Sequence, residues 1–176
     1  EKPGHRTGRR QDPGERQPLT DAGLPVDIVS GGGSGTYKVT PFFDQITEIQ
    51  AGGAILSDAT NRKRHVETDP AIFLRATVTS RPEPDRILHD AGFKALPVFY
   101  GDPEPRGLAN VAEIRTSAEH GIIALSAPSV APVIGTGIDF VIGYGDITVF
   151  MHDILYGVRD GVVEAEWPIA GRGKLQ

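Results

Sequence analysis

The residues best suited to chemistry lie in a short glycine-rich stretch from Gly31 to Thr36, with the sequence Gly-Gly-Gly-Ser-Gly-Thr. This stretch directly follows residues 26–30 (Val-Asp-Ile-Val-Ser), which are typical of a short buried strand. Since glycine has no Cβ, successive backbone N–H groups can turn toward one anion, and Ser34 and Thr36 add hydroxyl donors. The pattern favours a phosphate-binding loop at the carboxyl end of a strand, although flexible hairpins and linkers are also rich in Gly and Ser.

The same stretch does not match two common nucleotide-binding loops. It lacks the Gly-Lys-Ser/Thr ending of a nucleotide P-loop. It also lacks the Gly-x-Gly-x-x-Gly spacing that leads into a long helix in dinucleotide-binding proteins. The predicted ligand is therefore a phosphate group rather than a nucleotide held in either of these ways.

A second glycine pair, Gly52-Gly53, interrupts a predicted strand that covers residues 46–50 and resumes at residues 54–56. Such a pair could be only a β-bulge. If residues 26–30 and 46–50 are neighbours in a parallel sheet, however, both glycine clusters lie at the same carboxyl edge. Two clusters at one edge could then surround a single anion.

Two further groups of side chains could take part in acid–base or metal chemistry. His120 precedes a predicted strand and could be oriented by Glu119, although such histidines are more often hydrogen-bonded structural residues. Asp146 lies in a glycine-rich turn, where it either stabilises the turn or binds a divalent ion together with His120 or His152. On a predicted strand over residues 147–151, Asp146 and His152 would face the same side.

The elements that would position these residues change in character near residue 60. Before it, the order of strand, glycine-rich turn, helix-like connector and strand is typical of an α/β barrel or an open α/β sheet. After it, short β-branched segments separated by Gly and Pro predict an all-β domain, a barrel or a sandwich. The strands expected there cover residues 72–80, 93–100, 111–117, 121–126, 140–142, 147–151, 154–158 and 162–169.

The fold class expected is therefore α/β plus β, in three parts. Residues 1–20, rich in Arg, Gly and Pro, form either a poorly structured tail or a truncated domain edge. Residues 21–60 form the end of the α/β domain, beginning with the last turn of a helix that stops at Gly23. Residues 61–176 form the β domain. We expect an exposed connection over residues 58–69 and a short helical turn over residues 86–92.

Composition and charge limit the classes of function. The 176 residues include no Cys, which excludes disulfides, thiolate metal clusters and a Cys nucleophile. The net charge of −5 argues against a general nucleic-acid surface. No apolar run reaches the length of a membrane span and no signal-peptide pattern is visible, so the cytoplasm is the expected compartment.

Taken in order, six stretches resemble the family of D-threonine aldolases and D-serine dehydratases, which are pyridoxal 5'-phosphate (PLP) enzymes of the alanine racemase fold type. The stretches are Val-Ser-Gly-Gly-Gly-Ser-Gly-Thr-Tyr (29–37), Thr-Glu-Ile-Gln-Ala-Gly (47–52), Asp-Ala-Gly-Phe-Lys-Ala-Leu (90–96), Glu-His-Gly (119–121), Gly-Asp-Ile-Thr-Val-Phe-Met-His-Asp (145–153) and Trp-Pro-Ile-Ala-Gly-Arg-Gly (167–173). The resemblance extends from about residue 22 to the C-terminus.

The resemblance implies a PLP-binding (β/α)8 barrel followed by a C-terminal, barrel-like β domain. This chain would then hold the last barrel strands in residues 21–60 and the whole β domain in residues 61–176. The residues that match the family's phosphate-binding positions are Gly33, Ser34, Gly35, Thr36, Gly52 and Gly53. A homodimer that acts on a small D-amino acid is also implied, with no nucleic-acid or membrane partner.

The family further implies a divalent metal, Mn or Zn, in the β domain. Its ligands are a His and, two residues later, an Asp or Cys. Asp146 matches the second position, but Tyr144 replaces the His. Tyrosine is a poor ligand for these ions unless it loses its proton, so the metal site is incomplete unless His120 supplies the missing ligand.

The function implied is that of a lyase that cleaves the Cα–Cβ bond of a β-hydroxy D-amino acid or eliminates its β-hydroxyl, with Tyr144 and His120 as the catalytic candidates. The family's Schiff-base lysine lies on the first barrel strand, and no lysine of this chain has that context (Lys2, Lys38, Lys63, Lys94 and Lys174). Because PLP chemistry needs that amine, the chain is either the C-terminal part of a longer enzyme, inactive alone, or a degenerate relative. The alternatives are a racemase-like PLP enzyme and a non-catalytic phosphate- or PLP-binding protein.

Overall fold

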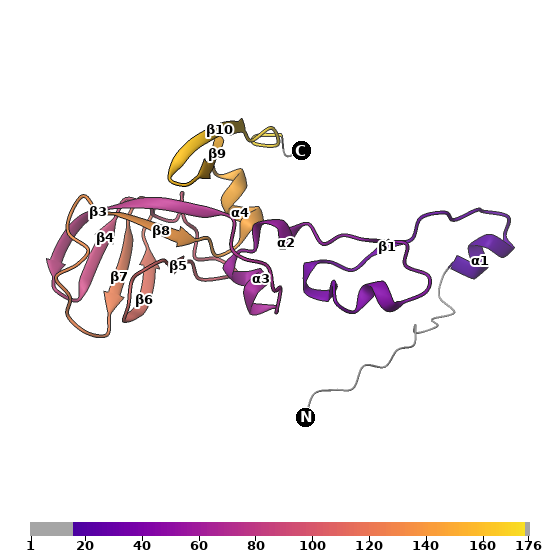
Figure 1. Cartoon of the computed structure of the whole chain (residues 1–176), viewed down its shortest axis with the longest axis horizontal. Coiled ribbons are helices and arrows are strands. Elements are labelled where there is room, and N and C mark those ends of the chain that lie inside the picture. The colour runs from indigo at the N-terminus through magenta and orange to yellow at the C-terminus, as the bar shows by residue number, and fades with distance from the viewer. Residues whose placement is uncertain (1–15, 175–176) are drawn as a thin grey trace, which may run out of the picture.

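A curled antiparallel sheet forms the larger part of the structure, and a slender N-terminal segment extends from one side of it (Figure 1). The computed structural model describes residues 16–174. The sheet has six strands in the order β5-β8-β3-β4-β7-β6, and all neighbours are antiparallel. The strands are β3 Phe73–Glu83, β4 Arg86–His89, β5 Glu104–Pro105, β6 Val111–Thr116, β7 Gly121–Leu125 and β8 Gly137–Val141.

The long strand β3 joins the two halves of this sheet. Its residues 73–77 pair with β8, whereas residues 78–83 pair with β4. The register shifts twice along the second pairing, and such irregularities increase the local twist of a strand. Because one strand changes partner midway, the sheet curls into a half-barrel, which is consistent with the barrel-like β domain expected in this part of the chain.

Alternating side chains of the sheet form a single apolar core. In β7, Gly121, Ile123 and Leu125 are buried and the residues between them are half-buried, which is the period of two expected for a strand. The largest fully buried apolar side chains come from β4, β7, β8 and the loops beside them, namely Phe140, Ile87, Leu96, Ile123 and Ile142. Burial of this apolar surface is the main stabilising contribution to the domain.

A histidine lies inside this core. His89 is fully buried, and its ring centroid is 4.9 Å from that of Phe140. A Cβ on Gly121 would lie 2.0 Å from His89 Cε1, so that strand position requires glycine. The Ala91 N–H donates to His89 Nδ1, while Nε2 has no partner among the described residues. Burial lowers the pKa of His89 to about 4, against a smaller opposing effect of Asp90, so the ring is neutral at neutral pH.

The N-terminal segment carries the two glycine clusters. Helix α1 (Arg16–Asp21) is closed two residues later by Gly23, which has a φ of +77° as predicted for a C-terminal stop, and whose N–H donates to the Thr20 carbonyl. Strands β1 (Ser30–Gly31) and β2 (Glu48–Ile49) are parallel neighbours, which confirms the expected pairing. Each strand is only two residues long, so the strand predicted over residues 26–30 is wrong in its extent. The prediction for residues 1–20 falls largely on residues 1–15, which lie outside the described residues.

Two short helices occupy the region predicted to resume the second strand and then to form an exposed connection. Residues Gly53–Leu56 form α2, so the glycine pair begins a helix and does not interrupt a strand. Residues Ala59–Lys63 form α3, and residues 58–61 are buried. The exposed connection predicted over residues 58–69 is therefore wrong for residues 58–61, whose buried polar groups have partners that the sequence alone does not reveal. Residues 62–65 and 67–69 are exposed, as predicted.

Three predictions within the β domain are also wrong. Residues 86–92 contain strand β4 instead of a helical turn, because the buried Ile87 and His89 alternate with the exposed Arg86 and the half-buried Leu88, and the strand pairs with β7. Residues 93–100 form turns instead of a strand. Residues 147–151 belong largely to helix α4 (Gly145–Phe150), although Ile, Thr and Val favour strands, because tertiary contacts fix the start of this helix.

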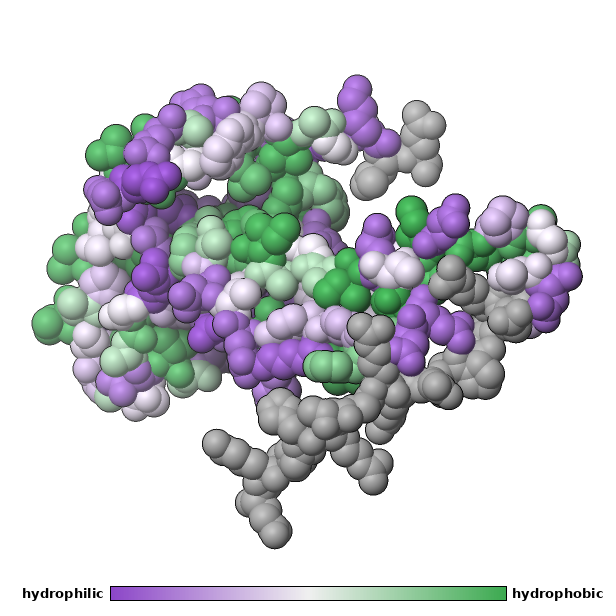
Figure 2. All heavy atoms as spheres, turned by 45° about the vertical axis from the view of Figure 1, so that its right-hand side comes forward, coloured by the Kyte–Doolittle hydropathy of each residue, from purple (hydrophilic) through white to green (hydrophobic). Residues whose placement is uncertain are grey.

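The last two strands, β9 (Ile154–Arg159) and β10 (Val162–Pro168), form a separate antiparallel hairpin (Figure 1). Its two strands agree with the strands predicted over residues 154–158 and 162–169. Its large side chains are exposed, and they include Tyr156, Val158, Val162, Val163 and Trp167. Figure 2 shows one side of the whole molecule, on which apolar side chains lie at several places with polar side chains between them. Across residues 16–174, no helix has the length and apolar character needed to cross a membrane.

The buried neutral ring of His89 should make stability depend on pH. An unfolded histidine binds a proton below about pH 6.5, whereas His89 resists protonation until about pH 4, so stability is complete above pH 6.5 and is lost as the pH falls toward 4. The loss attributable to this residue should reach about 2–3 kcal/mol. Urea midpoints measured from pH 7 to pH 4 should fall less steeply for His89→Leu than for the unaltered chain. Equal slopes would show that folding does not lower the pKa of His89.

Candidate functional site

The glycine-rich loop leaves β1 and enters a turn of 3-10 helix, η1 (Ser34–Thr36), before a second such turn, η2 (Thr40–Phe42). Gly32 has a φ of +71°, and a Cβ there would lie 2.4 Å from Thr40 Oγ1, so this position requires glycine. The Thr36 hydroxyl accepts the Gly33 N–H over 3.0 Å, and the Thr40 hydroxyl donates to Thr36 over 2.9 Å. These bonds hold the loop in one conformation.

The second glycine pair lies against this loop. A Cβ on Gly53 would lie 3.0 Å from Ser34 Oγ and 2.9 Å from Asn61 Nδ2, whereas a Cβ on Gly52 would meet nothing within 4 Å. The backbone N–H groups of Ser34, Gly35, Gly52 and Gly53 donate to no group in residues 16–174. The expected meeting of both clusters at one edge is therefore confirmed, and that edge presents N–H donors without a protein acceptor.

A buried carboxylate connects this edge to the β domain. Asp58 is 2% exposed, and its Oδ1 accepts the Asn61 N–H over 2.7 Å and the Asn61 side-chain amide over 3.0 Å. Its Oδ2 accepts the Gly145 N–H over 2.6 Å. Asp58 thus caps α3 and also satisfies a backbone donor at the start of α4, 87 residues away.

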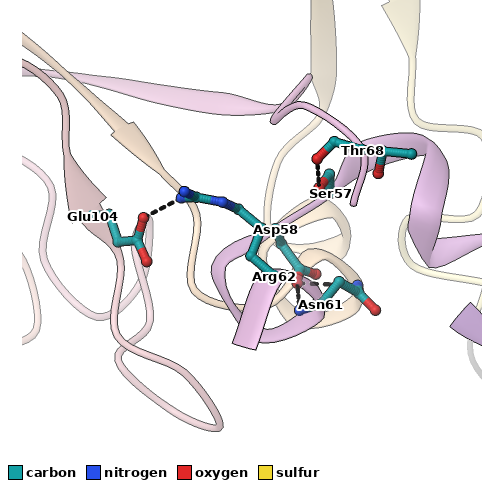
Figure 3. Close-up of polar contacts among 6 residues, drawn as sticks. All are labelled: Ser57, Asp58, Asn61, Arg62, Thr68 and Glu104. Atoms are coloured by element: carbon teal, nitrogen blue, oxygen red, sulfur yellow. Dashed lines mark hydrogen bonds and ion pairs between the residues drawn. The ribbon is translucent and has the colours of Figure 1, made fainter. Parts of the chain in front are cut away.

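Two further contacts fix α3 in place (Figure 3). Just before the helix, the buried Ser57 hydroxyl donates to the Thr68 carbonyl over 2.6 Å. On the helix, the Arg62 guanidinium forms an ion pair with Glu104 of β5. Figure 3 shows that Arg62 extends away from the side chains of Asp58 and Asn61, which lie together.

Two glycines allow two tyrosines to meet. A Cβ on Gly143 would lie 2.0 Å from the Gly101 carbonyl oxygen, so the two backbones can approach only without side chains. The adjacent Tyr100 and Tyr144 rings stack with centroids 5.1 Å apart and planes 26° apart. Thr60 of α3 donates to the Gly143 carbonyl through its N–H over 3.0 Å and through its hydroxyl over 2.8 Å.

Tyr144 and Asp146 form a polar pair at the start of α4. The Tyr144 hydroxyl donates to Asp146 Oδ2 over 2.7 Å. This hydrogen bond, aided by burial and by the charge of Asp146, raises the pKa of Tyr144 above its usual value, while Arg64 acts against it. The phenol therefore keeps its proton at neutral pH. The prediction that Asp146 and His152 share one side of a strand is wrong, because α4 separates them and His152 Nε2 lies 2.9 Å from the Ala95 carbonyl oxygen.

Arg64 lies between the glycine-rich loop and the tyrosines. It is the residue after the last one of α3, and its Cδ lies 3.7 Å from the point that a Cβ on Gly35 would occupy. Its guanidinium carbon is 5.9 Å from the Tyr100 ring centroid. A continuous row of contacts therefore extends from Gly35 through Arg64, Tyr100 and Tyr144 to Asp146. We call this row the loop-to-Asp146 surface.

His120 does not join this surface. It is exposed in the turn between β6 and β7, and its neighbour Glu119 forms an ion pair with Lys94 instead of orienting the His120 ring. No hydrogen bond, ion pair or ring contact in residues 16–174 links His120 to Tyr144 or Asp146. The same residues contain no group of three or more His, Asp and Glu side chains placed to hold a metal ion.

Sequence reasoning missed Asp58, Asn61, Arg64 and Tyr100, which lie in regions predicted as a connection or a strand. One signal was present for the helix: Asp58 is a favoured N-cap residue, and the basic residues 62–63 fall in the last turn. No comparable local signal exists for the stacking of Tyr100 on Tyr144, because it depends on a contact between distant glycines.

Comparison with known proteins supports the resemblance seen in the sequence. A family described as "Putative serine dehydratase domain" matches residues 71–158. A D-threonine aldolase of Arthrobacter sp. is 34% identical over 161 residues, which cover 89% of this chain and 42% of that protein. A 3-hydroxy-D-aspartate aldolase of Paracoccus denitrificans is 34% identical over 183 residues, which cover 98% of this chain and 47% of that protein.

A solved structure shows the same fold. The crystal structure of D-threonine aldolase from Filomicrobium marinum matches with a TM-score of 0.84 and 32% identity, over 92% of this chain and 46% of that one. The chain thus spans about half the length of the curated relatives that it matches.

Replacement of Asp58 by Ala should destabilise the protein strongly. The change removes the cap of α3 and leaves the buried Gly145 N–H without an acceptor, so the free energy of unfolding should fall by about 2–4 kcal/mol. Urea denaturation measures this loss. Asp58→Asn keeps one side-chain oxygen as an acceptor, so its free energy of unfolding should fall by less than that of Asp58→Ala.

Asp102→Ala is the control, because that exposed carboxylate lies 3.9 Å from Lys63 and should change stability by no more than about 0.5 kcal/mol. Equal stability of the Asp58 and Asp102 variants would show that the buried carboxylate does not hold α3 and α4 together.

Proposed function

Because the chain belongs to the serine dehydratase domain family, we propose that it forms the C-terminal part of a PLP-dependent lyase acting on β-hydroxy D-amino acids. The reaction would be Cα–Cβ cleavage, as in an aldolase, or β-elimination, as in a dehydratase. The observation that carries the proposal is the edge formed by both glycine clusters, where the backbone N–H groups of Ser34, Gly35, Gly52 and Gly53 have no acceptor in residues 16–174. A cytoplasmic location and a homodimer are part of the same proposal.

The residues at this edge fit the phosphate group of PLP. Gly33, Ser34, Gly35 and Thr36 would hold it from the loop, and Gly52 and Gly53 from the start of α2. The free N–H groups and the Ser34 hydroxyl are the donors that a phosphate accepts, and no side chain at Gly53 fills the space. When bound, PLP supplies an electron-accepting ring that favours the breaking of a bond at Cα.

The positions of the lysines in the described residues fit a chain that supplies part of a PLP enzyme better than one that holds its whole catalytic site. Lys38 pairs with Glu67, Lys94 pairs with Glu119, and Lys63 lies 3.9 Å from Asp102, all on the surface. Lys174, the last of the described residues, is exposed as well. We therefore propose that the amine that binds PLP covalently comes from outside this chain's part of the protein. A non-catalytic PLP-binding protein is the alternative that this arrangement also permits.

Tyr144 would exchange a proton with the substrate hydroxyl at its Oη atom. Because its pKa is raised, the phenol keeps its proton at neutral pH, and its hydrogen bond to Asp146 keeps the hydroxyl oriented. In β-elimination Tyr144 would donate this proton to the departing hydroxyl, which leaves as water. In Cα–Cβ cleavage Oη would accept the β-hydroxyl proton while the phenol passes its own proton to Asp146 Oδ2. A racemase-like proton transfer at Cα is the second candidate, favoured by the phenol that stands where the family has a metal ligand. The acid–base role of His120 stays a prediction, since no contact within residues 16–174 connects it to this pair.

The side chains present do not fit the family's divalent metal. Asp146 is the one matching carboxylate, and it accepts the Tyr144 phenol, which keeps its proton. The described residues supply no third ligand beside them. No step of the proposed chemistry therefore passes through a metal ion.

Gly53→Ala should weaken PLP binding, because the new methyl group would lie 2.9 Å from Asn61 Nδ2 and 3.0 Å from Ser34 Oγ, in the phosphate space. We expect the dissociation constant to rise by about tenfold or more, measured by 31P NMR titration with PLP. Gly171→Ala is the control, because its methyl group would meet nothing within 4 Å and Gly171 lies outside both glycine clusters. If both variants bind PLP as the unaltered chain does, the phosphate is held elsewhere.

Tyr144→Phe keeps the ring stacked on Tyr100 and removes only the hydroxyl. In the enzyme that contains this chain, turnover of a β-hydroxy D-amino acid should fall by about a hundredfold while PLP binding is unchanged. Steady-state kinetics gives the turnover number and the 31P titration gives the binding. Unchanged turnover would remove Tyr144 from the proposed chemistry.

A further inference from the structure

The Arg64 guanidinium has an unusual position among the charged groups of the chain. Its stem packs over Gly35 of the glycine-rich loop, and its charged end lies 5.9 Å from the Tyr100 ring centroid. Arg62, two residues earlier, forms an ion pair with Glu104. Arg64 forms no ion pair with any carboxylate of residues 16–174, so its N–H donors are available to a ligand.

The contacts of Arg64 favour an anionic ligand of planar shape. A guanidinium on an aromatic face keeps its edge N–H groups free, and these form two parallel hydrogen bonds with one carboxylate. The Tyr100 ring limits the orientations of the side chain, which lowers the entropy lost when the ligand binds. A monoanion with a flat carboxylate is thus a better match than an apolar group.

The position of Arg64 indicates which part of the ligand it would meet. The guanidinium and the Tyr144 hydroxyl lie on the loop-to-Asp146 surface, and the Tyr100 ring, stacked on Tyr144, lies between them. A substrate whose β-hydroxyl meets Tyr144 can direct the other substituent on the same carbon along the tyrosines toward Arg64. In D-threonine that substituent is a methyl group, and in 3-hydroxy-D-aspartate it is a carboxylate.

We propose that Arg64 is a specificity residue that selects β-hydroxy D-amino acids with a second carboxylate over those with an apolar substituent. This inference rests on the proposed function, because it needs a substrate bound between the glycine-rich loop and Tyr144. It narrows the substrate class to 3-hydroxy-D-aspartate and related dicarboxylic compounds. Arg64 has no part in bond breaking.

The test compares Arg64→Gln with Arg62→Gln, a matched control from the same helical region. Both variants remove one positive charge, but Arg62 points to Glu104 and lies outside the surface described above (Figure 3). In the enzyme that contains this chain, kcat/KM is measured for 3-hydroxy-D-aspartate and for D-threonine. The binding of succinate and of butyrate, which do not react, is measured in parallel by calorimetry.

We expect Arg64→Gln to lower kcat/KM for 3-hydroxy-D-aspartate by about tenfold to a hundredfold and to leave the value for D-threonine nearly unchanged. Succinate binding should weaken to the level of butyrate binding. For 3-hydroxy-D-aspartate, the kcat/KM of Arg64→Lys should lie between those of the unaltered enzyme and of Arg64→Gln, because an ammonium group keeps the charge but lacks the planar fork. Arg62→Gln should leave the ratio of the two substrates as it is.

Other results would overturn the inference. If Arg64→Gln lowers kcat/KM equally for both substrates while PLP binding is intact, Arg64 binds a group that both substrates share, such as the α-carboxylate. If the variant weakens PLP binding in a 31P titration, Arg64 serves the phosphate group instead. If PLP binding is intact and the ratio does not change, only the inference fails. If the unaltered enzyme neither binds PLP nor converts either substrate, the proposed function itself fails, and the inference with it.

Discussion

The arrangement of the site depends on the Asp58 carboxylate. A buried charge is strongly unfavourable unless donors surround it, and here the donors come from two separate places in the chain. Asn61 supplies two N–H groups from α3, and Gly145 supplies one from the start of α4. Since these bonds involve a charged acceptor, they are stronger than neutral ones. The carboxylate thereby fixes the distance between the glycine-rich loop and the residues that begin α4.

Close approaches between backbones complete this arrangement. Gly53 lets the start of α2 lie against Ser34, and Gly101 and Gly143 let two loops meet so that the adjoining tyrosines stack. In each case the geometry follows from the absence of a side chain. The site therefore combines a loop from the slender segment with tyrosines from the β domain, and α3 is the element between them.

The sequence revealed those parts of the fold that depend on local pattern. The glycine clusters and the pairing of their strands were predicted, as were the strands with clear alternation such as β6, β7, β9 and β10. The error at α4 has a physical cause. Residues 147–149 (Ile-Thr-Val) prefer strands, but the Gly145 N–H is held by Asp58 and the Tyr144 carbonyl accepts from Thr148.

The remaining part of the site could not be predicted because it depends on contacts between residues far apart in the sequence. Asp58 and Gly145 are 87 positions apart, and the hydrogen bond between them leaves no periodic trace. The polar residues 58–61 therefore looked exposed, although they are buried. Arg64 was missed for the same reason, since its neighbours Gly35 and Tyr100 come from different parts of the chain.

The exposed β9–β10 hairpin gives the protein a built-in optical reporter. Trp167 is the single tryptophan of the chain, and it lies on this hairpin with 56% of its surface exposed. Tryptophan emission therefore reflects the environment of the hairpin, while the buried core around Phe140 contributes nothing to that signal. A shift of the emission to shorter wavelength marks the covering of the hairpin by another surface, independently of whether the curled sheet is folded.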